Sequence, residues 1–406
     1  MEKIFAADKL TKRQRVEHTL AHQPVDRAAL LEQLSYNPKV IADWTGKDIK
    51  GFDFTFDDIC EVCRKTMDIV MPPSVGRRGK QRVAAPDGFV YQYDDWTAWC
   101  VGRPFDDEEG AKKWLVENMR KRRAAAWDAG QERKKYGEYL ADLQGRLGET
   151  LLLAYPVSTG LCAVYGDSCM GLEIFAYFFE AYPELFREHM DLFMMHSIRN
   201  IHAIGDVYRE YSPVVLVGED FATKQGPIFS PSFLNEFHYP NVKKLTDAWH
   251  EHGLKVIYHS DGNWKKVIPE LMDCNVDGFY CLEPNCGMDI VELKNTWPAM
   301  VWAGGVDGVD LMERGTPDQV RDEVGRHIRE TNALQTGGMF VASSSEINPP
   351  IKPENFRAMV EAVGEICNQS FIRVDDKRDL GASMVRYCQE KQETETFTAK
   401  VTKTRR

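Results

Sequence analysis

The sequence has no long apolar run, because no segment of 18 or more consecutive residues is apolar. A helix that crosses a bilayer needs about 20 such residues, so we exclude a membrane-spanning protein. The N-terminal segment from Met1 to Lys12 is charged and lacks the apolar core of a secretory signal. We therefore expect a cytoplasmic protein.

Basic charge is also scarce. Lys and Arg total 51 against 62 Asp and Glu, which gives a formal net charge of −11 at pH 7. Proteins that bind nucleic acid normally carry a basic stripe, and anionic membranes attract basic surfaces. We therefore expect neither partner, whereas a small molecule or a protein with a basic patch remains open.

Motifs of two other protein classes are missing. No GxGxxG sequence follows an apolar run, so a dinucleotide-binding fold lacks its fingerprint. The ten cysteines are scattered, and their only CxxC pair, Cys60 and Cys63, stands alone. A zinc ribbon or a redox motif is therefore unsupported, and we interpret the pair as part of helix packing.

Short apolar runs alternate with helical stretches over most of the chain. The helical stretches from residue 150 onward are 171–206, 231–252, 264–274, 288–295, 316–332 and 353–369. The apolar runs are 28–31, a segment near 67–70, 150–155, 213–218, 254–258, 278–282, 300–303 and 339–342. Such alternation is typical of parallel βαβ units. Eight strands favour a single (β/α)8 TIM barrel over an open doubly wound sheet.

The remaining segments predict additions to one α/β domain. Thr11 begins a helix with a capping box, residues 89–93 alternate like a hairpin strand, and residues 110–148 form a long charged helical stretch. We assign residues 1–375 to the barrel with its N-terminal helical and hairpin elaborations. Residues 376–406 are a polar tail that we expect to be partly disordered, with a short helix at 382–391.

Polar side chains follow most of the predicted strands. These residues are Glu32, Tyr155, Glu219, Asp220, His259, Asp261, Glu283, Asp307 and Glu346. Barrel active sites are built at the C-terminal ends of the strands, so the set predicts an active site at one mouth. A single acidic residue after a strand is more often a helix N-cap. The set as a whole is harder to explain by capping, because it gathers several carboxylates around one imidazole.

The chemistry of this set has two interpretations. One imidazole with two or three carboxylates can hold a divalent metal such as zinc, or it can act as general acid and base. Carboxylates that lie close together resist joint ionisation. A bound cation relieves this, and a metal-free site relieves it by keeping one carboxyl protonated; the sequence leaves both states open.

Two further groups of residues are ambiguous. Cys281 and Cys286 could supply thiol ligands, but a buried Cys281 with Cys286 in a loop is at least equally consistent with the pattern. A set of aromatic residues either lines an aromatic-substrate pocket or belongs to the core. These residues are Tyr36, Trp96, Trp99, Tyr155, Phe221 and Tyr280.

Several segments form an ordered series of motifs. They are residues 11–27, 218–231, 258–263, 267–271, 287–294, 302–307 and 350–356. Over roughly residues 10–370 this series resembles the uroporphyrinogen decarboxylase superfamily, closest to its cobalamin-dependent methyltransferase-like members. The resemblance implies a TIM barrel with its active site at the strand ends.

Two departures from the superfamily pattern narrow the function. Its decarboxylases carry arginines after the first strand to grip substrate carboxylates, whereas this chain has Glu32 in a segment without arginine. Its thiol-activating methyltransferases use a His-x-Cys pair and a later Cys as zinc ligands. At the matching places this chain has His259 with Asp261, and serines at 343–345. Oxygen ligands would thus replace thiolates, which disfavours thiol methylation.

The pattern and the resemblance together predict a methyltransferase that moves a methyl group from a small donor, of the methyl ether or methylamine type, to a corrinoid protein. Alternatives are a decarboxylase of a small carboxylic acid and a non-catalytic binding barrel. No cobalamin-binding signature is visible, so we expect the corrinoid on a partner protein, and a homodimer is left open. The assigned roles are catalytic for Glu219, Asp261 and Tyr155, substrate-binding for Glu32, Asn37, Asp220, Glu283 and Asp307, and metal-ligating, with zinc favoured, for His259, Asp261 and Glu346.

Overall fold

The structure is a computed structural model that describes residues 4–34, 36–75, 79–166 and 169–374. The predicted polar tail at 376–406, with its short helix at 382–391, lies outside the described residues. Within the described residues, every helix falls short of the length and apolarity that a bilayer crossing requires.

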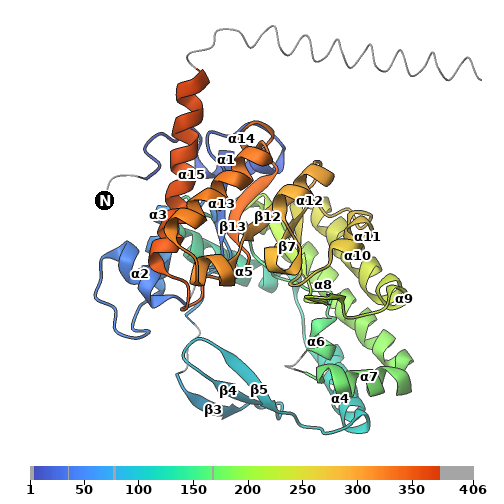
Figure 1. Ribbon diagram of the computed structural model, residues 1–406. Helices are drawn as coiled ribbons and strands as arrows, with labels where there is room; N and C mark the ends of the chain where they lie inside the picture. The colour runs from blue at the N-terminus through green and yellow to red at the C-terminus, as the bar shows by residue number, and fades with distance from the viewer. Residues whose placement is uncertain (1–3, 35, 76–78, 167–168, 375–406) are drawn as a thin grey trace, which may run out of the picture.

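Eight parallel strands form the centre of the molecule in a nearly closed barrel, in the order β6-β2-β1-β13-β12-β11-β10-β7 (Figure 1). They are β1 (Ala29–Glu32), β2 (Ile69–Val70), β6 (Leu151–Leu152), β7 (Val214–Gly218), β10 (Lys255–His259), β11 (Gly278–Tyr280), β12 (Val301–Val306) and β13 (Met339–Ser343). The fold is a (β/α)8 TIM barrel, as the alternation of apolar runs and helical stretches predicts.

The two end strands of this order, β6 and β7, are joined just beyond the β6 ladder. The Leu216 amide donates to the Ala154 carbonyl at 2.9 Å. The Tyr208 hydroxyl accepts from the Ala154 amide at 2.9 Å and lies 3.0 Å or less from the carbonyls of Leu152 and Val214. A buried side chain therefore satisfies backbone groups where the ladder is short.

Helices surround the barrel. They are α1 (Lys12–Leu20), α2 (Pro38–Thr45), α3 (Phe56–Thr66), α4 (Glu108–Ala124), α5 (Ala129–Leu147), α6 (Cys162–Tyr165), α7 (Gly171–Ala181), α8 (Pro183–Tyr211), α9 (Pro231–Phe233), the π-helix η1 (Leu234–His238), α10 (Tyr239–Glu251), η2 (Lys265–Val267), α11 (Ile268–Met272), η3 (Pro284–Cys286), α12 (Ile290–Thr296), the π-helix η4 (Gly308–Glu313), α13 (Pro317–Glu330), α14 (Ala333–Thr336) and α15 (Pro353–Val374). The predicted capping box is present, because the Thr11 side chain accepts from the Gln14 amide and Gln14 bonds back to the Thr11 amide.

Alternate residues of the strands belong to two different cores. Leu31 faces the barrel interior, where it packs with residues such as Leu216 and Ile257. Leu30 faces outward into a larger core between the sheet and the helices. Both faces of each strand are therefore buried, which explains why these strands read as continuous apolar runs. Cys60 and Cys63 lie in the outer core on α3, which confirms their interpretation as helix packing.

Two sequence-based boundaries are wrong. The stretch 110–148 is two helices, α4 and α5, and Asp128 caps the second through the Gln131 amide. The stretch 171–206 is also two helices, which separate at Tyr182 because Pro183 has no amide hydrogen and begins α8. Helical periodicity continues across both breaks, so only the local cap and the proline mark them.

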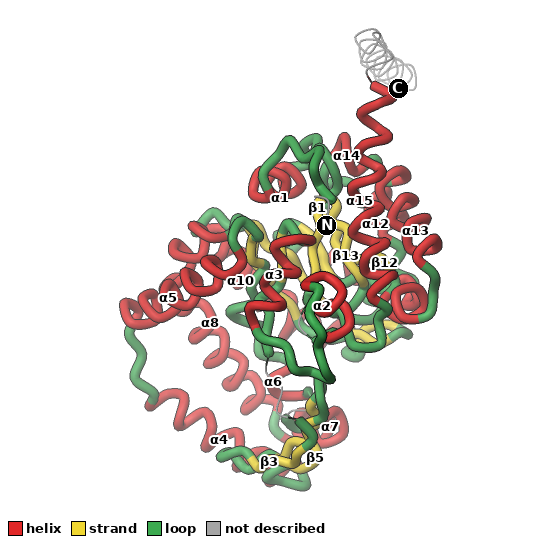
Figure 2. The backbone as a smooth tube through the Cα atoms, turned by 90° about the vertical axis from the view of Figure 1, so that its left-hand side faces the viewer, coloured by secondary structure: helices red, strands yellow, loops and turns green. Residues whose placement is uncertain are grey.

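A smaller lobe lies at one end of the barrel. It contains α4, α6, α7 and an antiparallel sheet of β3 (Gln81–Ala84), β4 (Val90–Tyr93) and β5 (Ala98–Gly102). The two views place this lobe below the barrel, with the long helix α8 reaching from one to the other (Figure 2). Its own core is aromatic and includes Phe89, Phe105 and Phe178. The predicted hairpin strand at 89–93 is confirmed as β4.

Candidate active site at the mouth of the barrel

The site forms where β7 and β10 end side by side. Gly218 and His259 are register partners in this parallel pair. A Cβ atom on Gly218 would lie 2.2 Å from the carbonyl oxygen of His259, so only glycine allows the two strand ends to approach this closely. The residues that follow each strand, Asp220 and Asp261, are thereby brought against the same imidazole.

Asp220, His259 and Asp261 form a cluster at this point. The Nε2 atom of His259 lies 3.3 Å from an Oδ1 atom of Asp220 and 3.8 Å from Oδ1 of Asp261. One potential ligand atom from each residue lies within 4.8 Å of the other two. The side chains of Asp220 and Asp261 are 56% and 57% exposed, against 26% for His259. The imidazole therefore lies deeper, and the two carboxylates line the open side.

The three residues of the cluster differ in the direction in which their pKa values are shifted. Burial disfavours a charged His259, but its hydrogen bond to Asp220 and the nearby charges of Asp261 and Glu346 raise its pKa above the usual value. Burial raises the pKa of Asp261 to about 6, with a further contribution from the charge of Asp220. Burial also opposes ionisation of Asp220, but the hydrogen bond with His259 lowers the pKa of that carboxyl. His259 and Asp220 therefore form an ion pair, and Asp261 is the carboxyl that takes up a proton first as the pH falls.

Two neighbouring glutamates hold the loops of the site. Glu219 accepts hydrogen bonds from the Thr159 hydroxyl at 2.7 Å and from the amides of Gly160 and Cys162 at 2.9 Å. Glu283 accepts from the Gly262 amide at 2.6 Å. Glu219 thus fixes the loop after β6 against β7, and Glu283 fixes the turn after Asp261. The predicted catalytic role of Glu219 stays a prediction, because in this structure both of its oxygens bond to that loop.

Glu32 lies fully buried at the end of β1. Its carboxyl oxygens contact the amide of Ser343 at 2.6 Å and the hydroxyl of Ser343 at 2.8 Å. Burial raises the pKa of Glu32 to about 8, against the opposing effect of these hydrogen bonds. Glu32 is therefore mainly protonated at neutral pH and joins β1 to β13. A substrate contact for Glu32 stays a prediction.

Two residues that are predicted to bind substrate cap helices in this structure. Asn37 is fully buried and caps α2: its side-chain oxygen accepts from the amides of Lys39 and Val40, and its nitrogen donates to the carbonyls of Asn348 and Ile351. Asp307 caps the π-helix η4 through one carboxylate oxygen. The hydrogen bonds of Asn37 are made within the fold in this structure, and its predicted contact with substrate stays a prediction. For Asp307, the hydrogen bonds in this structure are those of a helix N-cap, as expected for a single acidic residue after a strand.

The remaining predicted residues lie near the cluster but outside it. Glu346 contributes to the electrostatics of His259, but the three residues whose ligand atoms converge among the described residues include Asp220 and not Glu346. Tyr155 is partly exposed, and its hydroxyl donates to the Gly218 carbonyl. Burial and the charge of Glu219 raise the pKa of this phenol. Tyr155 is therefore a neutral hydroxyl at the strand end that carries the cluster.

Sequence reasoning missed the position of Asp220 in the cluster and the role of Cys281. The Cys281 thiol is buried, donates to the Ser344 carbonyl at 2.6 Å and interacts with the Asp261 carboxylate. Adjacent strands place both residues: β7 lies next to β10, and so does β11. The signal available in the sequence was strand adjacency, which puts Asp220 closer to His259 than a residue from the distant β13.

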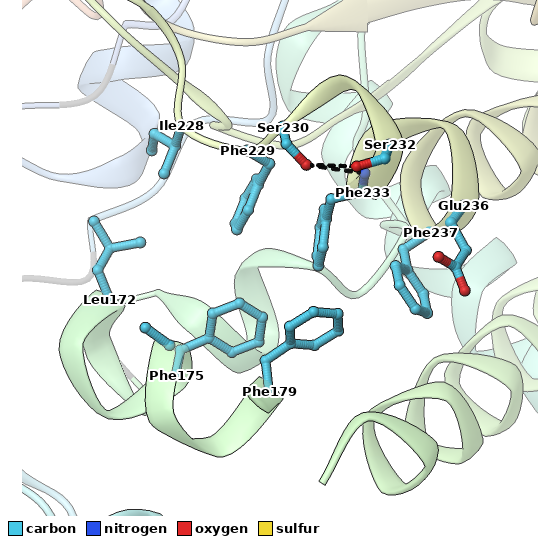
Figure 3. A pocket seen from close by; sticks show the side chains of 11 residues that line it. Leu172, Phe175, Phe179, Ile228, Phe229, Ser230, Ser232, Phe233, Glu236 and Phe237 are labelled. Atoms are coloured by element: carbon cyan, nitrogen blue, oxygen red, sulfur yellow. Dashed lines mark hydrogen bonds between the residues drawn. The ribbon is translucent and has the colours of Figure 1, made fainter. Parts of the chain in front are cut away.

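A hollow of about 520 Å³ lies between α7 and the segment 228–237 (Figure 3). Five phenylalanines contribute to its lining: Phe175, Phe179, Phe229, Phe233 and Phe237. None of the six aromatic residues considered from the sequence lines this pocket. Of those six, Phe221 and Tyr280 are buried in the core.

A solved structure of similar fold agrees with this architecture. Among solved structures, a methyltransferase from Methanosarcina mazei is similar over 88% of this chain and 99% of its own, with a TM-score of 0.59 and 16% sequence identity. A xylose isomerase-like TIM barrel protein from Mycobacterium smegmatis, in complex with magnesium, covers 70% of this chain and 94% of its own with a TM-score of 0.32 and 13% identity. No curated protein sequence matches the chain.

The family comparison is more specific, because the model of one family matches residues 154–366. This range contains β7, β10 and all three residues of the Asp220–His259–Asp261 cluster. The chain therefore belongs to the uroporphyrinogen decarboxylase (URO-D) family.

Proposed function

We propose that this protein is a cytoplasmic methyltransferase that moves a methyl group from a small donor, of the methyl ether or methylamine type, to a corrinoid carried by a partner protein. The observation that carries the proposal is the convergence of Asp220, His259 and Asp261 at the mouth of the barrel. The methyltransferase of similar fold supports it at the level of architecture only. The eight cysteines whose side chains the structure describes are free thiols, which agrees with a reducing compartment.

The cluster fits a divalent cation, for which zinc is our first choice. It offers one imidazole nitrogen and two carboxylate oxygens, which are ligand types that zinc accepts. Three protein ligands leave a position for the leaving atom of a methyl donor. A cation would also remove the repulsion between the two carboxylates, which contributes to the raised pKa of Asp261. We propose that His259, Asp220 and Asp261 hold this ion.

The metal, when bound, would supply a Lewis acid that makes the donor oxygen or nitrogen a better leaving group. The protein's own residues prepare the site. Glu219 and Glu283 hold the loops on either side of the cluster. Tyr155 presents a neutral phenol at the same strand end. Without a cation, the protonated imidazole of His259 is the group that can donate a proton to the leaving atom.

The substrate class is narrowed by the acidic character of the mouth. Asp220, Asp261, Glu283 and Glu346 all influence the titration of the cluster. A polyanionic substrate would be repelled by these carboxylates. A neutral ether or a methylamine avoids this repulsion, so we favour such donors over a carboxylic acid.

The test is methylation of cob(I)alamin by the purified, zinc-loaded protein. We expect its absorbance to decay when a methyl ether or a methylamine donor is added, and we expect His259→Ala to abolish this decay. Glu251→Gln, a change on the exposed end of α10, is the matched control and should retain the wild-type rate. Unchanged absorbance with every donor tested would contradict methyl transfer. Release of carbon dioxide without corrinoid would instead establish a decarboxylase.

A further inference from the structure

Aromatic rings form much of the lining of the pocket between α7 and the segment 228–237. Phe175 and Phe179 rise from α7, and Phe229 and Phe233 descend from the opposite wall, so that four rings surround one hollow (Figure 3). The Phe229 and Phe233 rings stack with centroids 4.4 Å apart and planes 17° apart. The Phe179 ring meets the Phe233 ring edge-on at 5.2 Å. Both faces and edges of aromatic rings therefore bound the pocket.

The pocket has the size and composition of a small-molecule site. Ligand sites in proteins usually occupy 300–1,000 Å³, with apolar walls and a few polar groups. An apolar cavity of about 150 Å³ holds one benzene molecule, so 520 Å³ has room for a molecule of two rings. Leu172 and Ile228 at its border are 47% and 36% exposed, and a ligand would cover part of this apolar surface.

One wall of the pocket carries a hydrogen-bonding group. The hydroxyls of Ser230 and Ser232 lie 2.9 Å apart, and Ser230 also accepts from the Phe233 amide (Figure 3). Two hydroxyls that share one hydrogen bond have a second hydrogen left to donate. This pair can therefore bind an oxygen on a ligand that is otherwise apolar.

We propose that this pocket is a binding site, separate from the Asp220–His259–Asp261 cluster, for a small molecule with one or two aromatic rings and an oxygen substituent. The rings of the ligand stack on Phe229 or Phe233 or meet their edges, because aromatic pairs prefer such arrangements. The oxygen faces Ser230 and Ser232. The inference does not depend on methyl transfer, since it rests on the pocket alone.

One wall of the pocket, the segment 228–237, is linked by hydrogen bonds to the strand ends that carry the cluster. Phe237 lines the pocket, and the next residue, His238, bonds through Nε2 to the Tyr258 hydroxyl at 2.7 Å. Tyr258 directly precedes His259 on β10. At the start of the same segment, the Ile228 amide donates to the carbonyl of Phe221, the residue after Asp220, at 2.8 Å. Both ends of the segment 228–237 are thus linked to the cluster through one or two intervening residues. Its C-terminal part belongs to the π-helix η1, a type of distortion often found at functional sites.

The experiment compares 2-naphthol with decahydro-2-naphthol, which has the same carbon skeleton and hydroxyl but no aromatic ring. Calorimetric titration of the full chain should show saturable 1:1 binding of 2-naphthol, at least tenfold tighter than that of the saturated analogue. Ala176→Phe places a ring in the pocket from an exposed position on α7, and it should weaken naphthol binding at least tenfold. Ala181→Phe, at the exposed end of the same helix and outside the pocket, should leave it unchanged.

Three outcomes would overturn the proposal. Equal affinity of Ala176→Phe and Ala181→Phe for 2-naphthol would show that the ligand binds elsewhere. Equal or tighter binding of the saturated analogue would indicate a general apolar site. A wild-type dimer in gel filtration that Ala176→Phe converts to a monomer would show that a second copy of the chain covers this surface. Circular dichroism and thermal melting of both variants check that each is folded, so that lost binding can be attributed to the pocket.

Discussion

At the scale of single residues, the cluster in the structure differs from the metal site predicted from the sequence by one residue. The structure brings Asp220 to His259 and Asp261, where the sequence predicted Glu346. Asp220 and Glu346 both follow barrel strands, and both carry carboxylates. Asp220 lies 3.3 Å from the imidazole of His259, whereas Glu346 affects that imidazole only through its charge. A separation of 3.3 Å allows Asp220 and His259 to bind the same metal ion. An effect of charge alone does not establish Glu346 as a ligand.

This difference predicts how metal binding responds to two matched substitutions. Asp220→Asn should lower the affinity of the protein for Zn²⁺ by at least about tenfold, because a neutral amide replaces an anionic ligand. Glu346→Gln should change the affinity by no more than about threefold, since it removes only a nearby charge. Competition with a chromophoric chelator measures both constants. A larger loss in Glu346→Gln than in Asp220→Asn would return Glu346 to the ligand set.

Glu32 is a second residue whose environment has a measurable consequence. Its pKa of about 8 means that the folded chain keeps a proton that the unfolded chain loses above its ordinary pKa of 4.5. The free energy of unfolding should therefore fall as the pH rises from about 4.5 to about 8, and this contribution should be level above pH 8. Below pH 4.5 Glu32 is protonated in both the folded and the unfolded chain, so its titration does not lower the free energy of unfolding.

The corresponding prediction is that Glu32→Gln stabilises the protein at alkaline pH. The amide has no charge to bury, so the variant should exceed the wild type at pH 9 by an amount on the order of a few kcal/mol. Near pH 4 the advantage should vanish. Urea denaturation across pH 4–9 measures this difference, with the exposed Glu251→Gln as control. A constant difference between variant and wild type over the whole range would contradict a titrating Glu32.

At the scale of elements, the pairing of β7 with β10 positions the cluster. The two strands are in register at Gly218 and His259. The missing side chain of Gly218 lets the His259 backbone approach, and the residues after each strand then face one another. A large side chain at this position would separate the strand ends that Asp220 and Asp261 extend.

Gly218→Ala should therefore damage the site more than its small size suggests. The new methyl group would meet the His259 carbonyl at 2.2 Å, and overpacking against backbone typically costs 1–3 kcal/mol. We expect a lower melting temperature together with weakened Zn²⁺ binding. Gly145→Ala on α5, where an added Cβ meets nothing within 4 Å, is the control and should raise stability by up to about 1 kcal/mol. Unchanged Zn²⁺ affinity in Gly218→Ala would show that the strand contact does not position the cluster.

At the scale of the whole molecule, a buried ion network joins the N-terminal segment to the barrel. Asp68, just before β2, accepts from Arg15 of α1 at 2.8 Å and from Arg27 at 2.7 Å. Asp26 bonds to Arg15 at 2.7 Å, and Asp8 contacts both arginines. These residues satisfy one another's charges inside the fold. The network therefore ties the segment before β1 to the second strand.

Breaking this network should destabilise the whole barrel. Asp68→Asn leaves two buried guanidinium groups short of one carboxylate, which costs about 3–5 kcal/mol. The neighbouring arginines lower the pKa of Asp68 despite its burial, and the hydrogen bond from Arg15 similarly lowers the pKa of Asp26 to about 2. The stabilisation from Asp68 is complete above its unfolded pKa near 3.8 and is lost progressively as the pH falls below that value toward the lower pKa of the folded state. The difference between Asp68→Asn and wild type, measured by urea denaturation, should thus shrink below pH 4. A deficit that persists unchanged at pH 2 would contradict this account, and Asp273→Asn at an exposed position serves as control.

Local pattern in the sequence determined the barrel and most of the groups at its mouth. Continuous apolar runs such as 213–218 occur because both faces of each strand are buried, and polar residues follow because strands end at the mouth. The capping box at Thr11 is equally local, since its hydrogen bonds span three residues. The breaks at Asp128 and Pro183 were accessible in principle, because a cap and a proline are also local signals.

Tertiary structure alone decided which of those polar groups meet. Glu32 ends β1 and Asn37 follows five residues later, yet Asn37 caps a helix and Glu32 is buried against Ser343. Asp220 joins His259 because β7 pairs with β10, and the aromatic pocket joins α7 to a segment about fifty residues later. These outcomes depend on register and strand order, which arise from contacts between residues far apart in the chain. Periodicity specifies which face of an element is buried, but it carries no information about which distant element will cover it.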